Sequence, residues 1–276
     1  MIGGDDDLLV RARAVLLDAL VALAEHRNSL VVIGAQAIYL QTGGALVAVA
    51  EATKDSDLAV DARVLRDHPL IDSAMERAGF ILNPTTNQPG AWMSANGIPV
   101  DLMVPEAIAG AGGTRSVTLP PHSKRAFRRA AGLEAAVVDN NEMEIRSLAA
   151  NDARAVTARV AGPAALLVAK LHKIAERQNT PGRLVYKDAH DIYRLLVAVP
   201  TDEIAAALER LLGDWLAGPV TSQAMTFLSE LFAAGPSALG ADMAGRAEAA
   251  VGEPETVAQA ASLLSNDLLE AVKRRL

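Results

Sequence analysis

The sequence contains no cysteine, very few aromatic residues and no long apolar run. Without cysteine the chain has no disulfide framework and no metal site built from thiolates. Aromatic residues make up only 3% of the 276 residues although 51% are hydrophobic, so the core must be built from alanine, leucine and valine. Such a composition is typical of a fold with many helices.

Membrane spans and a strongly basic character are missing as well. No apolar run approaches the roughly 18 residues that would cross a bilayer, and residues 1–7 are acidic rather than basic. We therefore expect a cytoplasmic protein that has no membrane partner. The net charge of −7 argues against binding of long duplex nucleic acid through an extensive basic surface, although it permits a local basic patch.

The length of 276 residues permits one large domain or two modest ones. Residues suited to chemistry fall in both halves of the chain, which favours two lobes around a cleft. We predict a mixed α/β core over residues 1–160 and a helical C-terminal lobe over residues 161–276.

Hydrophobic periodicity predicts most of the helices and strands. Apolar residues at three- and four-residue steps predict a helix over residues 7–27, and Gly79 is expected to end a helix over residues 62–78. The other predictions are strands at 30–33, 52–60, 98–104, 135–138 and 155–160, helices at 36–40, 163–178 and 188–198, a loop at 105–123 and further helices beyond Thr201.

Two aspartates stand one residue apart in the predicted strand over residues 52–60. Alternate residues of a strand point to one face, so Asp55 and Asp57 would lie there roughly 7 Å or less apart. Strands are depleted in aspartate, and two like charges on one face repel unless something compensates them. We expect the compensation to be a bound cation. The alternative is a solvated turn at a strand edge.

Asp101 is a candidate third ligand, because it is the single carboxylate within the apolar run over residues 98–104. Three carboxylates within about 4 Å of one another would repel by roughly 4 kcal/mol per pair at an effective dielectric near 20. Mg²⁺ prefers a few carboxylates together with phosphate oxygens and water. The set Asp55, Asp57 and Asp101 therefore predicts Mg²⁺ or Mn²⁺. For Asp101 the alternative is a lone acid that faces water at a strand edge.

The predicted helix over residues 163–178 carries a basic stripe. Lys170, Lys173 and Arg177 share one face by their spacing, and the stripe suits a triphosphate unless it is simply an exposed charged face. The next predicted helix carries Asp188, which could hold Lys170 through a charge-assisted bond or act as a charge at the helix N-terminus. These two roles can coexist.

Taken together, these residues resemble the signature of the nucleotidyltransferase superfamily, and more narrowly that of the AbiEii-like, toxin-type nucleotidyltransferases. The resemblance covers roughly residues 30 to 196. Two departures are Ala35, where a Gly or Ser is usual, and Ser56 between the two acids, where an aliphatic residue is usual. The matching residues are Gly34, Thr53, Asp55, Asp57, Asp101, Lys170, Arg177, Lys187, Asp188, Asp191 and Tyr193.

The resemblance implies a nucleotidyltransferase-fold mixed sheet flanked by helices, and a metal-dependent enzyme that transfers a nucleotide from an NTP to a hydroxyl. It implies a tRNA 3′ end as acceptor and an antitoxin protein as partner. A small-molecule nucleotidyltransferase of the antibiotic-modifying kind and a non-catalytic nucleotide-binding module are the alternatives. The implied catalytic residues are Asp55, Asp57, Asp101, Lys170 and Asp188, and the implied nucleotide-binding residues are Gly34, Ala35, Thr53, Lys173 and Arg177.

Other polar residues receive less specific interpretations. Residues 124–129 carry four positive charges, which we interpret as the solvated face of a surface helix, with binding of an RNA end as the alternative. His172 and His190 show no metal-ligand spacing and are expected to be packing or surface groups. Trp92 is expected to be a core residue of a hairpin, with base stacking as the alternative.

Overall fold

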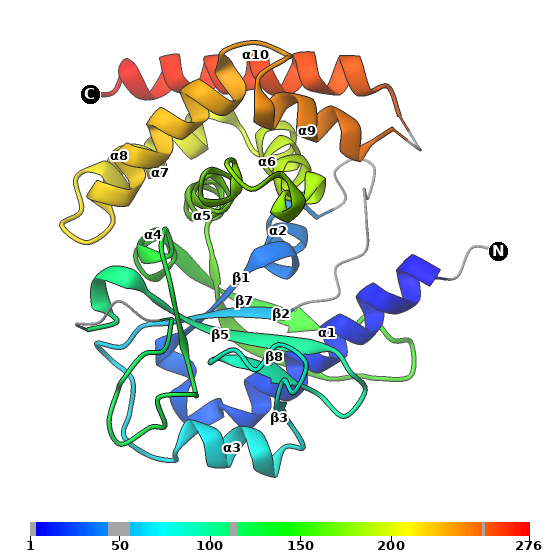
Figure 1. The fold of residues 1–276 in the computed structure, drawn as a ribbon, viewed down its shortest axis with the longest axis vertical. Helices are drawn as coiled ribbons and strands as arrows, with labels where there is room; N and C mark the ends of the chain where they lie inside the picture. The colour runs from blue at the N-terminus through cyan, green and yellow to red at the C-terminus, as the bar shows by residue number, and fades with distance from the viewer. Residues whose placement is uncertain (1–3, 44–55, 111–114, 250–251) are drawn as a thin grey trace. The chain divides into compact units, whose positions relative to one another are not determined.

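The structure is a computed structural model that describes residues 4–43, 56–110, 115–249 and 252–276. The chain divides into two compact units (Figure 1). The first, called the sheet unit, contains Met1–Ala37 and Ala52–Ala161. The second, called the helical unit, contains Ile38–Glu51 and Gly162–Leu276.

One mixed sheet forms the centre of the sheet unit. Its strands are β1 (Leu30–Ile33), β2 (Ser56–Val60), β3 (Ile81–Leu82), β4 (Ala91–Met93), β5 (Pro99–Pro105), β6 (Arg128–Ala130), β7 (Asn140–Arg146) and β8 (Ala155–Ala161). Among the described residues the order is β3-β4-β5-β2-β1-β8-β7, and β6 pairs with β5. The pairs β1–β8, β2–β5 and β5–β6 are parallel, whereas the other pairs are antiparallel.

Helices cover this sheet and continue from its strands. Helix α1 (Gly4–Ala22) packs on β2, β5 and β8 and lies beside α3 (Ile71–Arg77), as Figure 1 shows. A 3₁₀-helix, η1 (Ala24–Ser29), leads into β1, whose four residues are all buried, as expected for a central strand. Helix α2 (Gly34–Thr42) begins directly at the end of β1, and α4 (Glu134–Val138) contacts β1 and β2.

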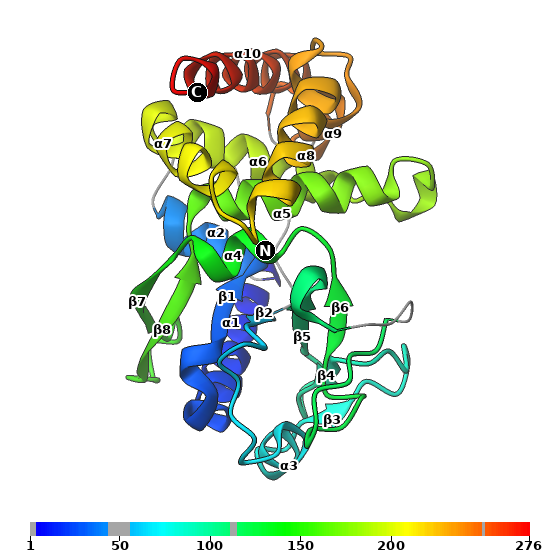
Figure 2. The ribbon, with the colours of Figure 1, turned by 90° about the vertical axis from the view of Figure 1, so that its left-hand side faces the viewer.

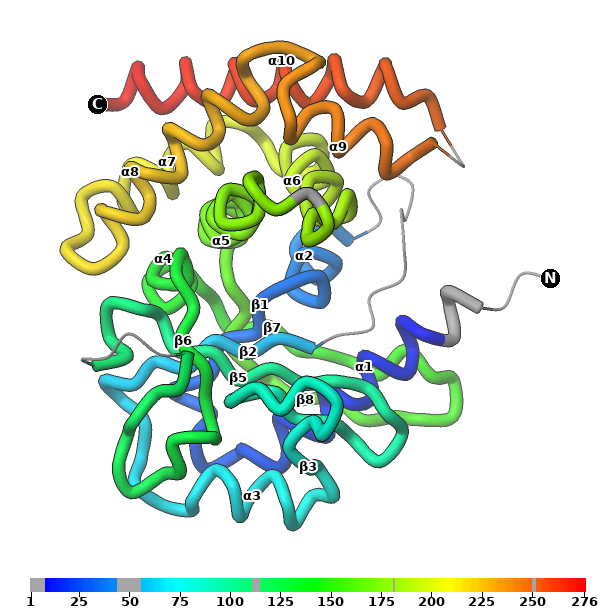
Figure 3. Tube along the Cα trace, viewed as in Figure 1, coloured from blue at the N-terminus to red at the C-terminus, as the bar shows by residue number. Residues whose placement is uncertain are grey.

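The helical unit is a bundle in which successive amphipathic helices bury leucine and alanine (Figures 2 and 3). Helix α5 begins after Gly162 with proline at its first position, where the missing N–H is harmless. The helices of the helical unit from Gly162 onward are α5 (Pro163–Arg177), α6 (Tyr186–Ala198), α7 (Thr201–Leu212), α8 (Gly218–Leu228), α9 (Leu239–Ala247) and α10 (Pro254–Lys273), with the short helical segments η3 (Pro181–Arg183) and η4 (Ser229–Ala233) between them.

The predicted fold class is confirmed: a mixed sheet flanked by helices is followed by a helical C-terminal region. Within the described part of the chain, no helix has both the length and the apolar content that crossing a membrane requires.

Three element predictions were wrong. The helix expected over residues 62–78 begins only at Ile71, because a proline at position 69 disfavours helical backbone in the residue before it. Residues 135–138 belong to helix α4 rather than a strand, since a four-residue apolar run does not distinguish the two and its alanines favour helix. Residues 124–129 form a turn that enters β6, so the expected surface helix is absent there.

Strand β7 was not predicted from the sequence. It is largely polar, with a buried residue only at Ile145, and it pairs antiparallel with β8 at the edge of the sheet. An exposed edge strand carries a weak hydrophobic alternation, so the period-two signal is easily missed.

Candidate active site

Asp57 and Asp101 are direct neighbours in the sheet. Strands β2 and β5 run parallel, and Asp57 is the register partner of Asp101. Neighbouring strands lie about 4.8 Å apart, and partners in register point to the same face of the sheet. Both side chains are half-buried, whereas the residues next to them along each strand are more deeply buried. The sheet therefore places Asp101, the candidate third ligand, beside the strand that carries Asp57.

Ser56 explains which face of the sheet the acids occupy. Its hydroxyl is fully buried and donates to the carbonyl oxygen of Ala12 in α1, at 3.1 Å. Because alternate residues of a strand point to opposite faces, Asp57 lies on the face away from α1. The hydroxyl at position 56, where the resemblance leads one to expect an aliphatic side chain, thus serves packing against α1.

Gly34 makes room for the Asp57 carboxylate. It adopts a φ of +68° between β1 and α2, a conformation that side chains rarely tolerate. A Cβ at this position would lie 2.3 Å from Oδ2 of Asp57. Glycine is therefore required here both for the turn and for the close approach of the aspartate.

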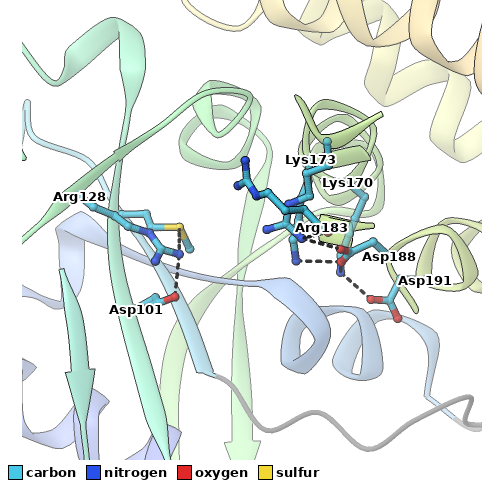
Figure 4. A network of polar contacts seen from close by, with 9 residues as sticks. Asp101, Arg128, Lys170, Lys173, Arg183, Asp188 and Asp191 are labelled. Carbon is cyan, nitrogen blue, oxygen red and sulfur yellow. Dashed lines mark hydrogen bonds and ion pairs between the residues drawn. The ribbon is translucent and has the colours of Figure 1, made fainter. Parts of the chain in front are cut away.

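Arg128 compensates Asp101 but not Asp57. Its Nη2 donates to Oδ2 of Asp101 at 2.6 Å and also lies 3.2 Å from the sulfur of Met103 (Figure 4). The pair is partly accessible, with side chains 22% and 19% exposed. The sequence hypothesis of a solvated basic face missed this role. The apolar pair Ala126 and Phe127 between the basic residues was the signal that this segment enters the core.

Gly90 allows β6 to bring Arg128 alongside β5. At its φ of +70°, a Cβ would lie 2.4 Å from the backbone nitrogen of Arg128 and 2.4 Å from the carbonyl oxygen of Leu102. No side chain fits between these two backbone segments. The backbone N–H of Gly90 also donates to the carbonyl oxygen of Arg125.

Within the described residues, no donor group contacts the Asp57 carboxylate. Carboxylate oxygens are the ligands that Mg²⁺ takes from proteins, usually one or two of them alongside phosphate oxygens and water. The pair Asp57 and Asp101 fits that chemistry. A cluster of three or more acidic or histidine ligands does not occur in the described part of the chain. Two predicted site residues, Asp55 and Thr53, lie outside the described residues.

A second charge cluster lies in the helical unit, between α5 and α6. Nζ of Lys170 donates to Oδ1 of Asp188 at 2.7 Å and to Oδ2 of Asp191 at 2.6 Å (Figure 4). Lys173 donates to Asp188 at 2.8 Å, and Arg177 forms an ion pair with Asp188 at 3.5 Å. The bond between Lys170 and Asp188, one of the two roles considered for Asp188 from the sequence, is present in the structure.

Burial and pairing fix the ionisation of this cluster. Burial alone would lower the pKa of Lys170, but Asp188 and Asp191 outweigh it and raise that pKa. Burial likewise favours a higher pKa for Asp188, whereas Lys170 and Lys173 hold it well below its ordinary value. Lys170 and Asp188 are therefore both charged over the whole ordinary pH range. Asp191, to which the sequence interpretation gave no separate role, is the second carboxylate that compensates Lys170.

The basic residues of the cluster differ in accessibility. The Lys170 side chain is only 8% exposed, while Lys173 is 40% and Arg177 is 23% exposed. Lys173 and Arg177 are thus better placed than Lys170 to meet a ligand from solvent.

Ala35 is buried in the first turn of α2, where backbone N–H groups have no partner within the helix.

Three other residues considered from the sequence are packing groups. Trp92 is fully buried and donates from its indole to the carbonyl of Ala126. His172 stacks edge-on against Phe227 and bonds the Val220 carbonyl oxygen. His190 is buried with its Nε2 2.7 Å from Glu248.

No protein-family model matches the chain, and no curated protein matches it. Among solved structures, the chain is similar to a protein from H. pylori assigned as a nucleotidyltransferase. The two chains are 13% identical with a TM-score of 0.34, and the match covers 96% of this chain and 98% of the other. A likeness this distant establishes neither a shared fold nor a shared activity.

Proposed function

We propose that this chain is a metal-dependent nucleotidyltransferase, which transfers a nucleotide from an NTP to a hydroxyl group of an acceptor. The register of Asp57 with Asp101 on neighbouring strands is the observation that carries the proposal. Two half-buried like charges side by side are unfavourable in a purely structural role, because each raises the energy of the other. A bound cation would offset the repulsion between the two carboxylates.

The donor set fits Mg²⁺ or Mn²⁺. Asp57 and Asp101 would hold the cation, with Asp55 as the third ligand expected from the resemblance. When bound, the cation supplies positive charge at the phosphate and activates the attacking hydroxyl. The Arg128 guanidinium already pairs with Asp101, so its positive charge would oppose binding of a cation at that carboxylate. Gly34 keeps the Asp57 carboxylate in place beside the first turn of α2.

The residues of the helical unit receive complementary roles. Lys173 and Arg177 are proposed to bind phosphate oxygens, because they are cationic and accessible. Lys170 is proposed to orient Asp188 and, through it, the two more exposed cations. The third N–H of the Lys170 ammonium remains for a phosphate, since its two bonds to Asp188 and Asp191 use two of three donors.

The acceptor and the partners are proposed from the resemblance. A tRNA 3′ end is the proposed acceptor, and an antitoxin protein is the proposed partner that controls the enzyme. The net charge of −7 argues mildly against a large RNA footprint, so recognition would be confined to the end of the strand. A small-molecule hydroxyl is the rival acceptor.

The test is incubation of the chain with labelled NTPs, Mg²⁺ and total RNA, followed by separation of RNA from small products. The parent is compared with Asp57→Ala and with Asp67→Ala as a matched control, since Asp67 is an exposed aspartate of the same unit. We expect label in RNA for the parent and for Asp67→Ala. For Asp57→Ala we expect a loss of about 10²-fold or more, because a catalytic cation supplies several kcal/mol.

The other outcomes separate the rivals. Label that appears only in a small product after addition of low-molecular-weight hydroxyl compounds supports the small-molecule enzyme. NTP binding without transfer to any acceptor supports the non-catalytic module. Equal transfer by the parent and by Asp57→Ala contradicts the proposed role of the acid pair.

A further inference from the structure

A pocket of about 410 Å³ lies in the sheet unit, at the other end of β1 and β2 from Gly34. Its lining comes from η1, from the segment after β2, from the end of α4 and from β8. Asp61 lines it, four residues beyond Asp57, which corresponds to roughly 13 Å along a strand. The pocket is therefore separate from the acid pair. Its volume is in the range that holds a small ligand.

The acidic residues of the pocket are already neutralised. Asp61 is buried and accepts two hydrogen bonds from the Arg63 guanidinium, each at 2.9 Å, and a third from the Arg63 backbone at 3.1 Å. Glu25 is exposed and lies 3.4 Å from Arg66. These two ion pairs cancel in charge. What remains in the lining is one further cation, Arg159.

Arg159 is half-buried and has only neutral acceptors. Its Nε donates to the side-chain oxygen of Asn140 at 2.7 Å, and its Nη1 donates to the carbonyl oxygen of Asn28 at 2.8 Å. No carboxylate of the described residues pairs with it. A guanidinium has five N–H donors, so three of them are left after these two bonds. A partly desolvated cation of this kind favours an anion as its partner.

His26, in the same lining, has one ring nitrogen without a hydrogen-bond partner among the described residues. It is 1% exposed, and its Nε2 lies 2.7 Å from the carbonyl oxygen of Pro69, to which a protonated Nε2 donates. Burial lowers the pKa of His26, with His122 and Arg66 acting in the same direction. The ring is therefore neutral, and its Nδ1 is an acceptor with no partner among the described residues. Buried polar atoms without partners are rare and call for an explanation.

We propose that this pocket binds a small phosphate-bearing ligand, with Arg159 as its principal anchor. Arg63 and Arg66 also line the pocket, each already in an ion pair with Asp61 or Glu25. The exposed Arg66 can add a weaker contact to phosphate oxygens, whose geometry arginine matches. The site would act apart from nucleotidyl transfer, because it uses none of the residues assigned to that reaction.

Calorimetric titration of the full chain tests this proposal. The probes are inorganic phosphate, a nucleoside monophosphate and a dicarboxylate, used at low ionic strength because salt screens exposed charges. The parent is compared with Arg159→Gln and with Arg27→Gln, in which the same charge is removed from an exposed residue of η1. We expect saturable binding of a phosphate probe, weakened about tenfold or more in Arg159→Gln and unchanged in Arg27→Gln.

Arg66→Gln provides a second variant, because Arg66 is largely exposed and its loss does not threaten folding. A weakening of about two- to threefold is expected there. Binding of the monophosphate but not of inorganic phosphate would identify a nucleotide as the ligand. The proposal is overturned if no phosphate probe binds saturably, if only the dicarboxylate binds, or if Arg159→Gln and Arg66→Gln both bind as the parent does. Asp57→Ala is expected to bind normally, which separates this site from the proposed active site.

Discussion

The two charge clusters of this chain are built in opposite ways. In the helical unit, Lys170 is buried and bonds two aspartates, so every charge at the centre of that cluster has its partner. In the sheet unit, Asp57 and Asp101 are half-buried neighbours of like charge, and among the described residues only Asp101 has a cationic partner. The first arrangement fixes a structure. The second leaves charge uncompensated, which is the condition under which a carboxylate pair can bind a cation.

Removal of Lys170 should have the largest effect on stability. In Lys170→Met, Asp188 and Asp191 would remain buried without their shared partner, and breaking a buried ion pair in this way costs about 3–5 kcal/mol. Urea unfolding measures the change. Lys173→Met is the control, because the Lys173 side chain is 40% exposed and its pair should contribute less than about 1 kcal/mol. Similar losses in the two variants would contradict the distinction between a buried anchor and an exposed cation.

The same cluster should make stability depend on pH at both extremes. The pKa of Asp188 is held below its ordinary value of 3.8, so its contribution is present above that pH and is lost as the pH falls through the lowered pKa. The pKa of Lys170 is raised above its ordinary value of 10.5, so its contribution is present below that pH and is lost as the pH rises further. The free energy of unfolding should therefore differ between the parent and Asp188→Asn by a constant amount between these limits. A difference that already changes near neutral pH would contradict this assignment.

The elements that carry the two charge clusters were largely predictable from the sequence, because they depend on spacing within a single helix or strand. The spacing of Lys170 and Arg177 on a helix fixes a shared face, and the apolar run around Asp101 predicts a buried strand. The partner of Asp101 was not predictable, because Arg128 reaches it through a parallel pairing between β5 and β6 across 27 residues of chain. Sequence spacing describes contacts within one element, whereas pairing between distant strands depends on the whole sheet.

Gly34→Ala should have a smaller but measurable effect on both stability and activity. The new Cβ would require a positive φ and would meet Oδ2 of Asp57 at 2.3 Å, so the carboxylate must move. Side chains in this conformation cost about 1–2 kcal/mol. We expect a loss of that order in urea unfolding, together with reduced nucleotidyl transfer. Gly97→Ala is the control, because its φ is also positive but a Cβ there meets nothing. If Gly97→Ala lowered transfer equally, strain rather than displacement of Asp57 would be responsible.

Arg128→Gln should have the smallest effect on stability and an informative effect on cation binding. The Arg128–Asp101 pair is partly solvated, so its loss should change the free energy of unfolding by less than about 1 kcal/mol. Because the positive charge of the guanidinium beside Asp101 opposes a second cation there, the variant should bind Mn²⁺ about two- to fivefold more tightly, as measured by electron paramagnetic resonance. Arg125→Gln, an exposed neighbour that bonds Asn87, should leave the affinity unchanged. Weaker Mn²⁺ binding in Arg128→Gln would mean that Arg128 holds Asp101 in its binding position and does not compete with the cation. Asp57→Asn should weaken Mn²⁺ binding in either case.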